Sequence, residues 1–152
     1  MISIYTDGSS RGNPGPGGYG VVMKYGDHRK EISEGFRMTT NNRMELLSVI
    51  VALENLKKHG SHVTIYSDSK YVVDSVEKGW VVGWEKKKFA KKKNPDLWKR
   101  FLIIYRKHKV KFVWVKGHAS NVENNRCDEL AVEAALSNDL KEDSGYENGD
   151  GE

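Results

Sequence analysis

The alternation of apolar and polar positions along the chain predicts five β-strands. Each predicted strand alternates and is rich in β-branched or aromatic side chains. The segments are residues 2–7, 20–24, 30–37, 63–67 and 110–115. Gly26 and Asp27 separate two of these strands and indicate a hairpin turn. The glycine- and proline-rich stretch from Gly8 to Gly20 indicates a tight loop, because glycine allows unusual backbone angles and proline fixes them.

Helical spacing of apolar residues is clearest in residues 42–59, where Asn42 is a candidate cap and Gly60 a natural stop. Further helices are predicted for residues 69–77, 95–107 and 125–136, while residues 80–93 are ambiguous between helical turns and a loop. The first three strands are consecutive, and the last two are reached through helices. The pattern therefore predicts an α/β fold with a five-stranded mixed sheet flanked by helices on both faces.

Two of the predicted strands share a short sequence that ends in an aspartate. The sequence is IYTD at residues 4–7 and IYSD at residues 65–68. If these are neighbouring parallel strands, about 4.8 Å apart, the carboxylates of Asp7 and Asp68 lie side by side. Sheets of this kind bind ligands beyond the carboxyl ends of their parallel strands. The spacing suits a pair of aspartates that holds a divalent metal.

Two more acids map to the same end of the sheet. Glu45 lies near the start of the long helix, and Asp128 lies near the start of the last one. Each acid also has a structural interpretation, as a turn residue, a helix cap or a partner of the helix dipole. Together, four oxygen ligands favour hard cations such as Mg²⁺ or Mn²⁺. His118, in a polar loop, is either a proton-transfer group or an exposed loop residue.

The composition describes one domain of 152 residues, with a single cysteine and no apolar run long enough for a signal peptide or a membrane span. We expect a cytoplasmic protein. Residues 84–111 carry twelve basic and two acidic residues, interleaved with aromatic residues, which favours nucleic acid over a merely solvated lysine-rich surface. Trp114, between apolar neighbours, is expected in the core. Residues 138–152 are acidic and lack periodicity, so we expect a disordered tail.

Six sequence blocks together resemble the type 1 ribonucleases H, the bacterial ribonuclease HI family. The blocks are YTDGS at residues 5–9, GNPGPGGYG at 12–20, TTNNRMEL at 39–46, SDS at 67–69, WVKGH at 114–118 and NNRCDELA at 124–131. They occur in the expected order across residues 2–136. The resemblance implies a ribonuclease H-like fold, with a catalytic domain at residues 1–137 followed by the acidic tail at residues 138–152.

The resemblance implies an endoribonuclease that hydrolyses the RNA strand of RNA/DNA hybrids and leaves 3′-hydroxyl and 5′-phosphate ends. Its cofactor is expected to be two Mg²⁺ ions, with Mn²⁺ as a possible substitute, in a two-metal mechanism. The implied metal ligands are Asp7, Glu45, Asp68 and Asp128, and the implied catalytic residues are these four together with His118. The expected partner is the hybrid duplex, with no membrane, and the expected state is a monomer.

The family also implies a set of nucleic-acid-binding residues. RNA is distinguished by its 2′-hydroxyl groups in the minor groove, which small polar groups can reach. The matching positions are Asn13, Thr40, Asn41, Asn42 and Arg43, together with Trp80, Trp84, Lys86, Lys87 and Lys88 in the basic segment. Position 70 departs from the family, because Lys70 stands where a neutral glutamine is common.

Two other functions remain open at the level of sequence. One is a non-catalytic nucleic-acid-binding module, which the four acids disfavour because carboxylates near a phosphate backbone repel it unless metal neutralises them. The other is a different enzyme on the same fold, either a DNA-strand nuclease or an integrase-like transferase. The block at residues 40–45 and the loop at Gly117 and His118 disfavour that reading.

Overall fold

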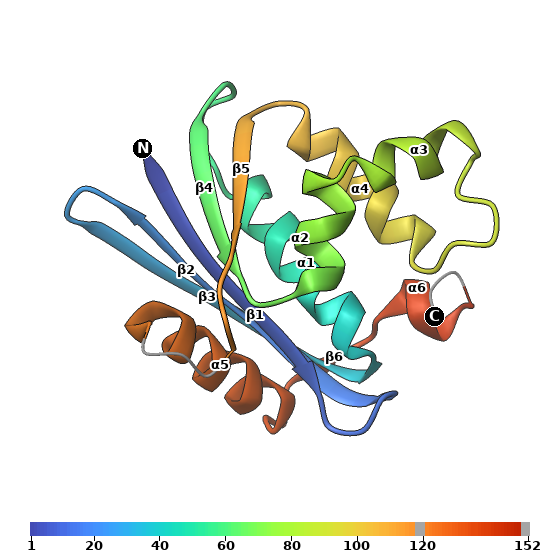
Figure 1. The fold of residues 1–152 in the computed structure, drawn as a ribbon. Coiled ribbons are helices and arrows are strands. Elements are labelled where there is room, and N and C mark those ends of the chain that lie inside the picture. The colour runs from blue at the N-terminus through green and yellow to red at the C-terminus, as the bar shows by residue number, and fades with distance from the viewer. Residues whose placement is uncertain (118–120, 150–152) are drawn as a thin grey trace.

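The computed structural model describes residues 1–117 and 121–149, which form one mixed sheet with helices on both faces (Figure 1). The described strands have the order β5-β4-β1-β2-β3-β6. They are β1 (Ile2–Ser10), β2 (Gly15–Tyr25), β3 (His28–Thr39), β4 (His62–Ser67), β5 (Lys109–Trp114) and β6 (Leu140–Lys141). The first three are antiparallel, while β4 and β5 run parallel to β1. The five predicted strands are present, and the short β6 is an addition.

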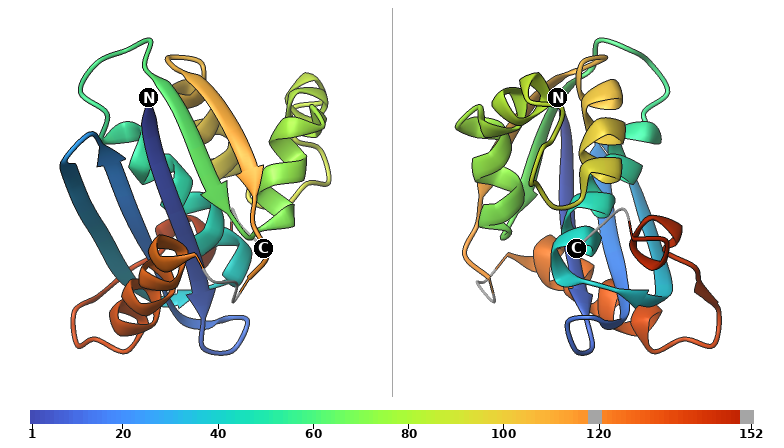
Figure 2. Two further views of the ribbon diagram at one scale, coloured as in Figure 1. Left: turned by 60° about the vertical axis from the view of Figure 1, so that its left-hand side comes forward. Right: turned by 90° about the vertical axis from the view of Figure 1, so that its right-hand side faces the viewer.

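The helices divide between the two faces of the sheet. They are α1 (Asn41–Glu54), α2 (Lys70–Glu77), α3 (Trp80–Lys86), α4 (Pro95–Tyr105), α5 (Val122–Ala135) and α6 (Ser144–Glu147). Figure 2 shows α5 on one face, with α1, α2 and α4 on the other. A Cβ at Gly20 would lie 2.3 Å from the carbonyl oxygen of Cys127, so this glycine lets α5 pack directly on β2. Within the described residues, no helix has both the length and the apolar character that a membrane span needs.

The register between β1 and β4 aligns the two matching sequences. Ile4 pairs with Ile65 and Tyr5 with Tyr66, and the two tyrosine rings stack with centroids 4.9 Å apart. Asp7 and Asp68 follow the paired tyrosines by two residues on each strand. The predicted parallel neighbours are therefore correct. Asp68 follows the last residue of β4 as predicted, whereas Asp7 does not end its strand, because β1 continues past its pairing with β4 and stays paired with β2 as far as Ser10.

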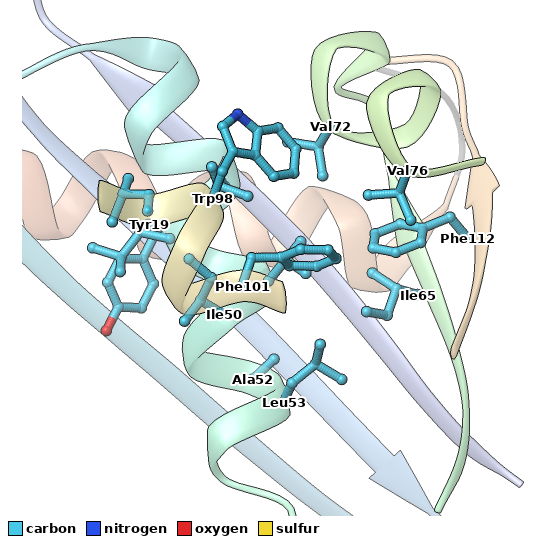
Figure 3. Close-up of a cluster of buried hydrophobic side chains, with 14 of the residues drawn as sticks. Tyr19, Ile50, Ala52, Leu53, Ile65, Val72, Val76, Trp98, Phe101 and Phe112 are labelled. Carbon is cyan, nitrogen blue, oxygen red and sulfur yellow. The ribbon is translucent and has the colours of Figure 1, made fainter. Parts of the chain in front are cut away.

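The main core lies between the sheet and the helices α1 and α4. Trp98 and Phe101 of α4 are fully buried and meet edge to face, with ring centroids 5.5 Å apart. They belong to the same buried cluster as Ile50 of α1 and Ile65 of β4, which the close-up in Figure 3 shows. This apolar contact fixes α1, and hence its N-terminal end, against the sheet. Trp114 is not part of the core as expected, because 43% of it is exposed.

Two helices begin at residues other than those predicted. Thr40, not Asn42, caps α1, because its hydroxyl oxygen accepts a hydrogen bond from the backbone N–H of Arg43 at 3.3 Å. Asn121 caps α5 by accepting from the N–H groups of Glu123 and Asn124. Since α5 starts at Val122, Asp128 lies in its second turn and not in its first. Asp128 is thus too far from the helix end to serve as a dipole partner.

The C-terminal segment differs most from its prediction, because residues 138–149 are folded where a disordered tail was expected. Leu140 of β6 pairs with Gly35 of β3, and α6 follows. Asp143 is buried and binds Arg43 of α1, while Glu147 forms an exposed ion pair with Arg37. The segment is polar because it docks through ion pairs instead of an apolar stripe. Composition alone therefore indicated disorder.

Candidate active site

Three carboxylates meet where β4 ends beside the middle of β1. One ligand oxygen from each of Asp7, Glu45 and Asp68 lies within 4.8 Å of the others. Asp7 belongs to β1, Asp68 follows β4, and Glu45 comes from the first two turns of α1. Gly8 makes this approach possible, because a Cβ there would lie 2.3 Å from the carbonyl carbon of Met44. The sheet and the helix thus bring together side chains that lie far apart in the sequence.

The carboxylate of Asp68 does not cap α2, although the sequence alone allowed that role. Ser69 caps α2 instead, with its hydroxyl oxygen accepting from the N–H of Val72 at 3.2 Å. The backbone of Asp68 is held from the other side, because the indole N–H of Trp114 donates to its carbonyl oxygen at 3.1 Å. The segment that follows β5 also lies close to this carboxylate, since a Cβ at Gly117 would be 3.0 Å from Oδ2 of Asp68.

Burial and mutual repulsion dominate the electrostatics of this cluster. Burial, followed by the charges of Asp68 and Asp128, raises the pKa of Asp7 to about 8, although Gly8 N–H donates to its Oδ1 at 2.9 Å. Burial and the two aspartates also raise the pKa of Glu45 well above its ordinary range. The Oε1 atom of Glu45 is buried and has no hydrogen-bond partner among the described residues. An oxygen-only set of this kind fits a hard divalent cation, which would satisfy that atom and screen the repulsion.

Asp128 belongs to the same cleft but stands apart from the three-carboxylate cluster. The cleft has a volume of about 430 Å³, and α5 lines one wall of it with Asn121, Asn124, Asn125 and Asp128. Asp128 is close enough for its charge to raise the pKa of Asp7. The structure therefore brings all four predicted acids to one cleft, three in mutual contact distance and the fourth on the wall.

The asparagines of α5 are cleft residues that the sequence reasoning missed. Asn121, Asn124 and Asn125 lie three to seven residues before Asp128, so helical periodicity places them on the same face of α5. Asn124 donates to the carbonyl oxygen of Tyr66 at 3.4 Å, and its own Oδ1 is buried without a hydrogen-bond partner among the described residues. The spacing alone would have found them once Asp128 had been placed in the site.

The glycine loop and the first turn of α1 are tied to each other by asparagines. The Oδ1 atom of Asn13 accepts from the N–H of Asn41 at 3.0 Å, and the Oδ1 atom of Asn41 accepts from the N–H of Ser10 at 2.6 Å. Asn41 and Asn42 both line the cleft. Asn41 and Asn42 therefore lie beside the carboxylates, and Asn13 lies in the loop that adjoins them.

Thr40 and Arg43, also predicted to bind nucleic acid, face the interior. Thr40 is 4% exposed and caps α1, and Arg43 is 1% exposed with its guanidinium held by Asp96 and Asp143. Neither side chain is available to a substrate. Sequence reasoning placed them with their neighbours in the motif, but a helical turn sends successive side chains to different sides.

The basic segment carries its lysines outward and Trp84 inward. Lys86, Lys87 and Lys88 are exposed, and none of the ion pairs found among the described residues involves them. Trp84 is partly buried against Trp98, with ring centroids 5.8 Å apart, whereas Trp80 is 47% exposed. Trp80 and the lysines are thus available for nucleic acid, and Trp84 anchors the segment. The predicted His118 lies outside the described residues.

Comparison with known proteins places the chain in a family. Residues 1–136 match the family model for RNase H. A ribonuclease H of Syntrophus aciditrophicus is 56% identical over 151 residues, covering 96% of this chain and 87% of that protein. A ribonuclease H of Desulforamulus reducens is 59% identical over 139 residues, covering 88% of this chain and 87% of that protein.

Solved structures agree with the sequence comparison. LC9-RNase H1, a type 1 RNase H, is 34% identical with a TM-score of 0.80, covering 97% of this chain and 79% of that one. LC11-RNase H1, solved in complex with an RNA/DNA hybrid, is 32% identical with a TM-score of 0.68, covering 90% and 100%. The chain therefore belongs to the RNase H family of enzymes, and the resemblance to type 1 ribonucleases H that its motifs predicted is confirmed.

In the absence of metal, we expect Asp7→Asn to be more stable than the wild type at pH 8. A carboxyl whose pKa is raised on folding contributes fully to stability below its unfolded pKa, here 3.8. That contribution is lost as the pH rises to the pKa of the folded state, here about 8. Removing the charge should raise the free energy of unfolding by about 1–3 kcal/mol, since solvent at the cleft screens part of the repulsion. Urea unfolding in chelator at pH 5 and pH 8 measures this. A gain that does not grow with pH would contradict it.

Proposed function

We propose that this chain hydrolyses the RNA strand of RNA/DNA hybrids, using divalent metal held by Asp7, Glu45 and Asp68 with Asp128 beside them. The carboxylate cluster carries this proposal, in particular the buried and unpartnered Oε1 atom of Glu45. The RNA/DNA hybrid in the complex of LC11-RNase H1 supports the substrate. The products would be a 3′-hydroxyl and a 5′-phosphate end.

Divalent metal, Mg²⁺ with Mn²⁺ as a substitute, would supply the Lewis acidity that activates water for in-line attack and stabilises the leaving 3′ oxygen, as a pair of ions in the substrate complex. The carboxylates' part is to face one point, so that a bound cation would favour their ionised forms over the protonated forms that burial and crowding favour without it. Because a cation relieves their repulsion and an anion adds to it, the site is prepared for metal and a phosphodiester together, and not for an anion alone.

Substrate choice would come from the polar groups beside the carboxylates. Asn42, Asn41 and Asn13 present amide groups along the cleft or the adjoining loop, where they would meet the 2′-hydroxyls of the RNA strand in the minor groove. Such contacts read the sugar and not the base, so cleavage should tolerate any sequence. The exposed lysines at positions 86–88 would contact phosphates of the DNA strand. A cytoplasmic location and a monomeric state stay predictions.

The direct test is cleavage of a strand-labelled hybrid by wild type and by Asp7→Asn. The wild type should cut only the RNA strand, only with Mg²⁺ or Mn²⁺, and should leave duplex RNA and duplex DNA intact. Asp7→Asn should lose activity by roughly a thousandfold or more, because a metal site that lacks a ligand and its charge no longer stabilises the transition state. Asp74→Asn, a partly buried aspartate on α2, is the matched control and should cleave normally.

Each other outcome has a clear meaning. Binding of the hybrid without cleavage would favour a non-catalytic module, and cleavage of the DNA strand would favour a different nuclease. Full activity in folded Asp7→Asn would remove Asp7 from the metal site.

Changing Lys86, Lys87 and Lys88 to glutamine should weaken hybrid binding and flatten its dependence on salt. Each phosphate contact contributes roughly 0.9 to the slope of log K against log salt, so losing three should reduce it by about 2 to 3. The same substitutions at Lys57 and Lys58, exposed lysines beyond the opposite end of α1, are the control. Fluorescence anisotropy across a salt series measures the slope. An unchanged slope in the triple variant would mean that the basic segment does not contact the substrate.

A further inference from the structure

Arg43 is a buried cation that the chemistry of the cleft does not use. Its side chain is 1% exposed, and its guanidinium meets two carboxylates in a forked arrangement. Nε and Nη2 donate to Asp143 at 2.7 and 2.9 Å, while Nη1 and Nη2 donate to Asp96 at 2.9 and 2.7 Å. Nη1 also donates to the side-chain oxygen of Asn94 at 3.2 Å. So many charged hydrogen bonds on one buried group fix its position closely.

These contacts join three segments that are distant in the sequence. Arg43 belongs to the first turn of α1, Asp96 to the first turn of α4, and Asp143 precedes α6 in the C-terminal segment. The segment lies directly on the pair, since a Cβ at Gly145 would be 2.6 Å from Nη2 of Arg43. Thr39, at the end of β3, donates to Oδ2 of Asp143 at 2.7 Å. Figure 1 shows α6 on the side of the sheet where α4 begins.

The N-terminal end of α1, its first two turns, contacts two different sites. Asn41, Asn42 and Glu45 line the cleft, whereas Arg43 points away from it into the ion-pair cluster. Of the three clustered carboxylates, Glu45 is the one that does not come from the sheet. Repulsion from Asp7 and Asp68 therefore tends to push this end of the helix away from the strands. An anchor on the far side of the same helix end opposes that displacement.

We propose that Asp143 is a positioning residue for catalysis, which acts through Arg43 to hold Glu45 and Asn42 at the cleft. The inference rests on the proposed function, because it assigns the C-terminal segment a part in that same site. The match to the family model ends at residue 136, so Asp143 lies beyond it. The C-terminal segment thus does more than add β6 to the edge of the sheet. It completes the ion-pair cluster that positions the N-terminal end of α1 at the cleft.

A purely structural role for Asp143 would lower the stability of the protein and leave the site intact once the protein is folded. A positioning role changes the site of the folded protein. Removing one carboxylate leaves Arg43 buried beside Asp96 alone, with a weaker hold on the C-terminal segment. The turn would then yield to the repulsion at Glu45, and the metal ligands would no longer converge.

Two variants and a control separate these roles. Asp143→Asn removes the charge with little change of shape, and Gly145→Ala should displace the segment by steric contact while leaving every charge in place. Glu147→Gln removes an exposed ion pair of the same segment with Arg37 and does not touch Arg43. All variants are measured at a temperature at which circular dichroism shows them fully folded.

The readouts are Mn²⁺ binding by calorimetry without substrate, and kcat and KM for hybrid cleavage. In Asp143→Asn and Gly145→Ala we expect Mn²⁺ affinity to fall by roughly threefold or more and kcat/KM to fall by on the order of tenfold, since small misplacements of catalytic groups are costly. Glu147→Gln should match the wild type in both.

The outcomes distinguish the inference from the function on which it rests. Wild-type affinity and kcat/KM in both folded variants would overturn the positioning role and leave Asp143 a stabilising residue only. Equal losses in Glu147→Gln would also overturn it, because the effect would then not pass through Arg43. A wild type that binds Mn²⁺ but never cleaves the hybrid would contradict the proposed function, while weakened Mn²⁺ binding in the two variants would still support the anchoring of the turn.

Discussion

Repulsion among three clustered carboxylates is the constraint on which the rest of this structure depends. The fold places Asp7, Glu45 and Asp68 where each raises the free energy of ionising its neighbours, and it buries one oxygen of Glu45 without a hydrogen-bond partner among the described residues. Such an arrangement persists only because the surrounding packing holds it together. Such repulsion lowers stability and is expected where charge must be ready for a ligand.

The scaffold supplies that support from both faces of the sheet. Parallel pairing of β1 and β4 sets the two aspartates, and the aromatic core around Trp98 and Phe101 holds α1 against the strands. On the other face, α5 packs closely on β2 and brings Asp128 to the wall of the cleft. The buried ion pairs of Arg43 then locate the turn that carries Glu45. These elements together therefore set the geometry of the site.

Much of this could be predicted from the sequence, because the signals are local. The matching residues before Asp7 and Asp68 predicted the strand pairing, and the motif blocks predicted the family. What the sequence did not predict depends on contacts across long separations. Arg43 was predicted to bind nucleic acid because its partner Asp143 lies 100 residues away, and the C-terminal segment was predicted to be disordered because its anchors are charged. A cation within a motif carries no sign of whether it points to solvent or to a buried acid.

The most direct test of the central claim is a metal titration of stability. Binding to the folded state alone raises its stability with the logarithm of the free ligand concentration. The thermal unfolding midpoint of the wild type at pH 8 should therefore rise steadily with Mn²⁺ or Mg²⁺, and that of Asp7→Asn should rise much less. An unchanged wild-type midpoint, or an equal rise in both proteins, would show that the clustered carboxylates do not form the metal site.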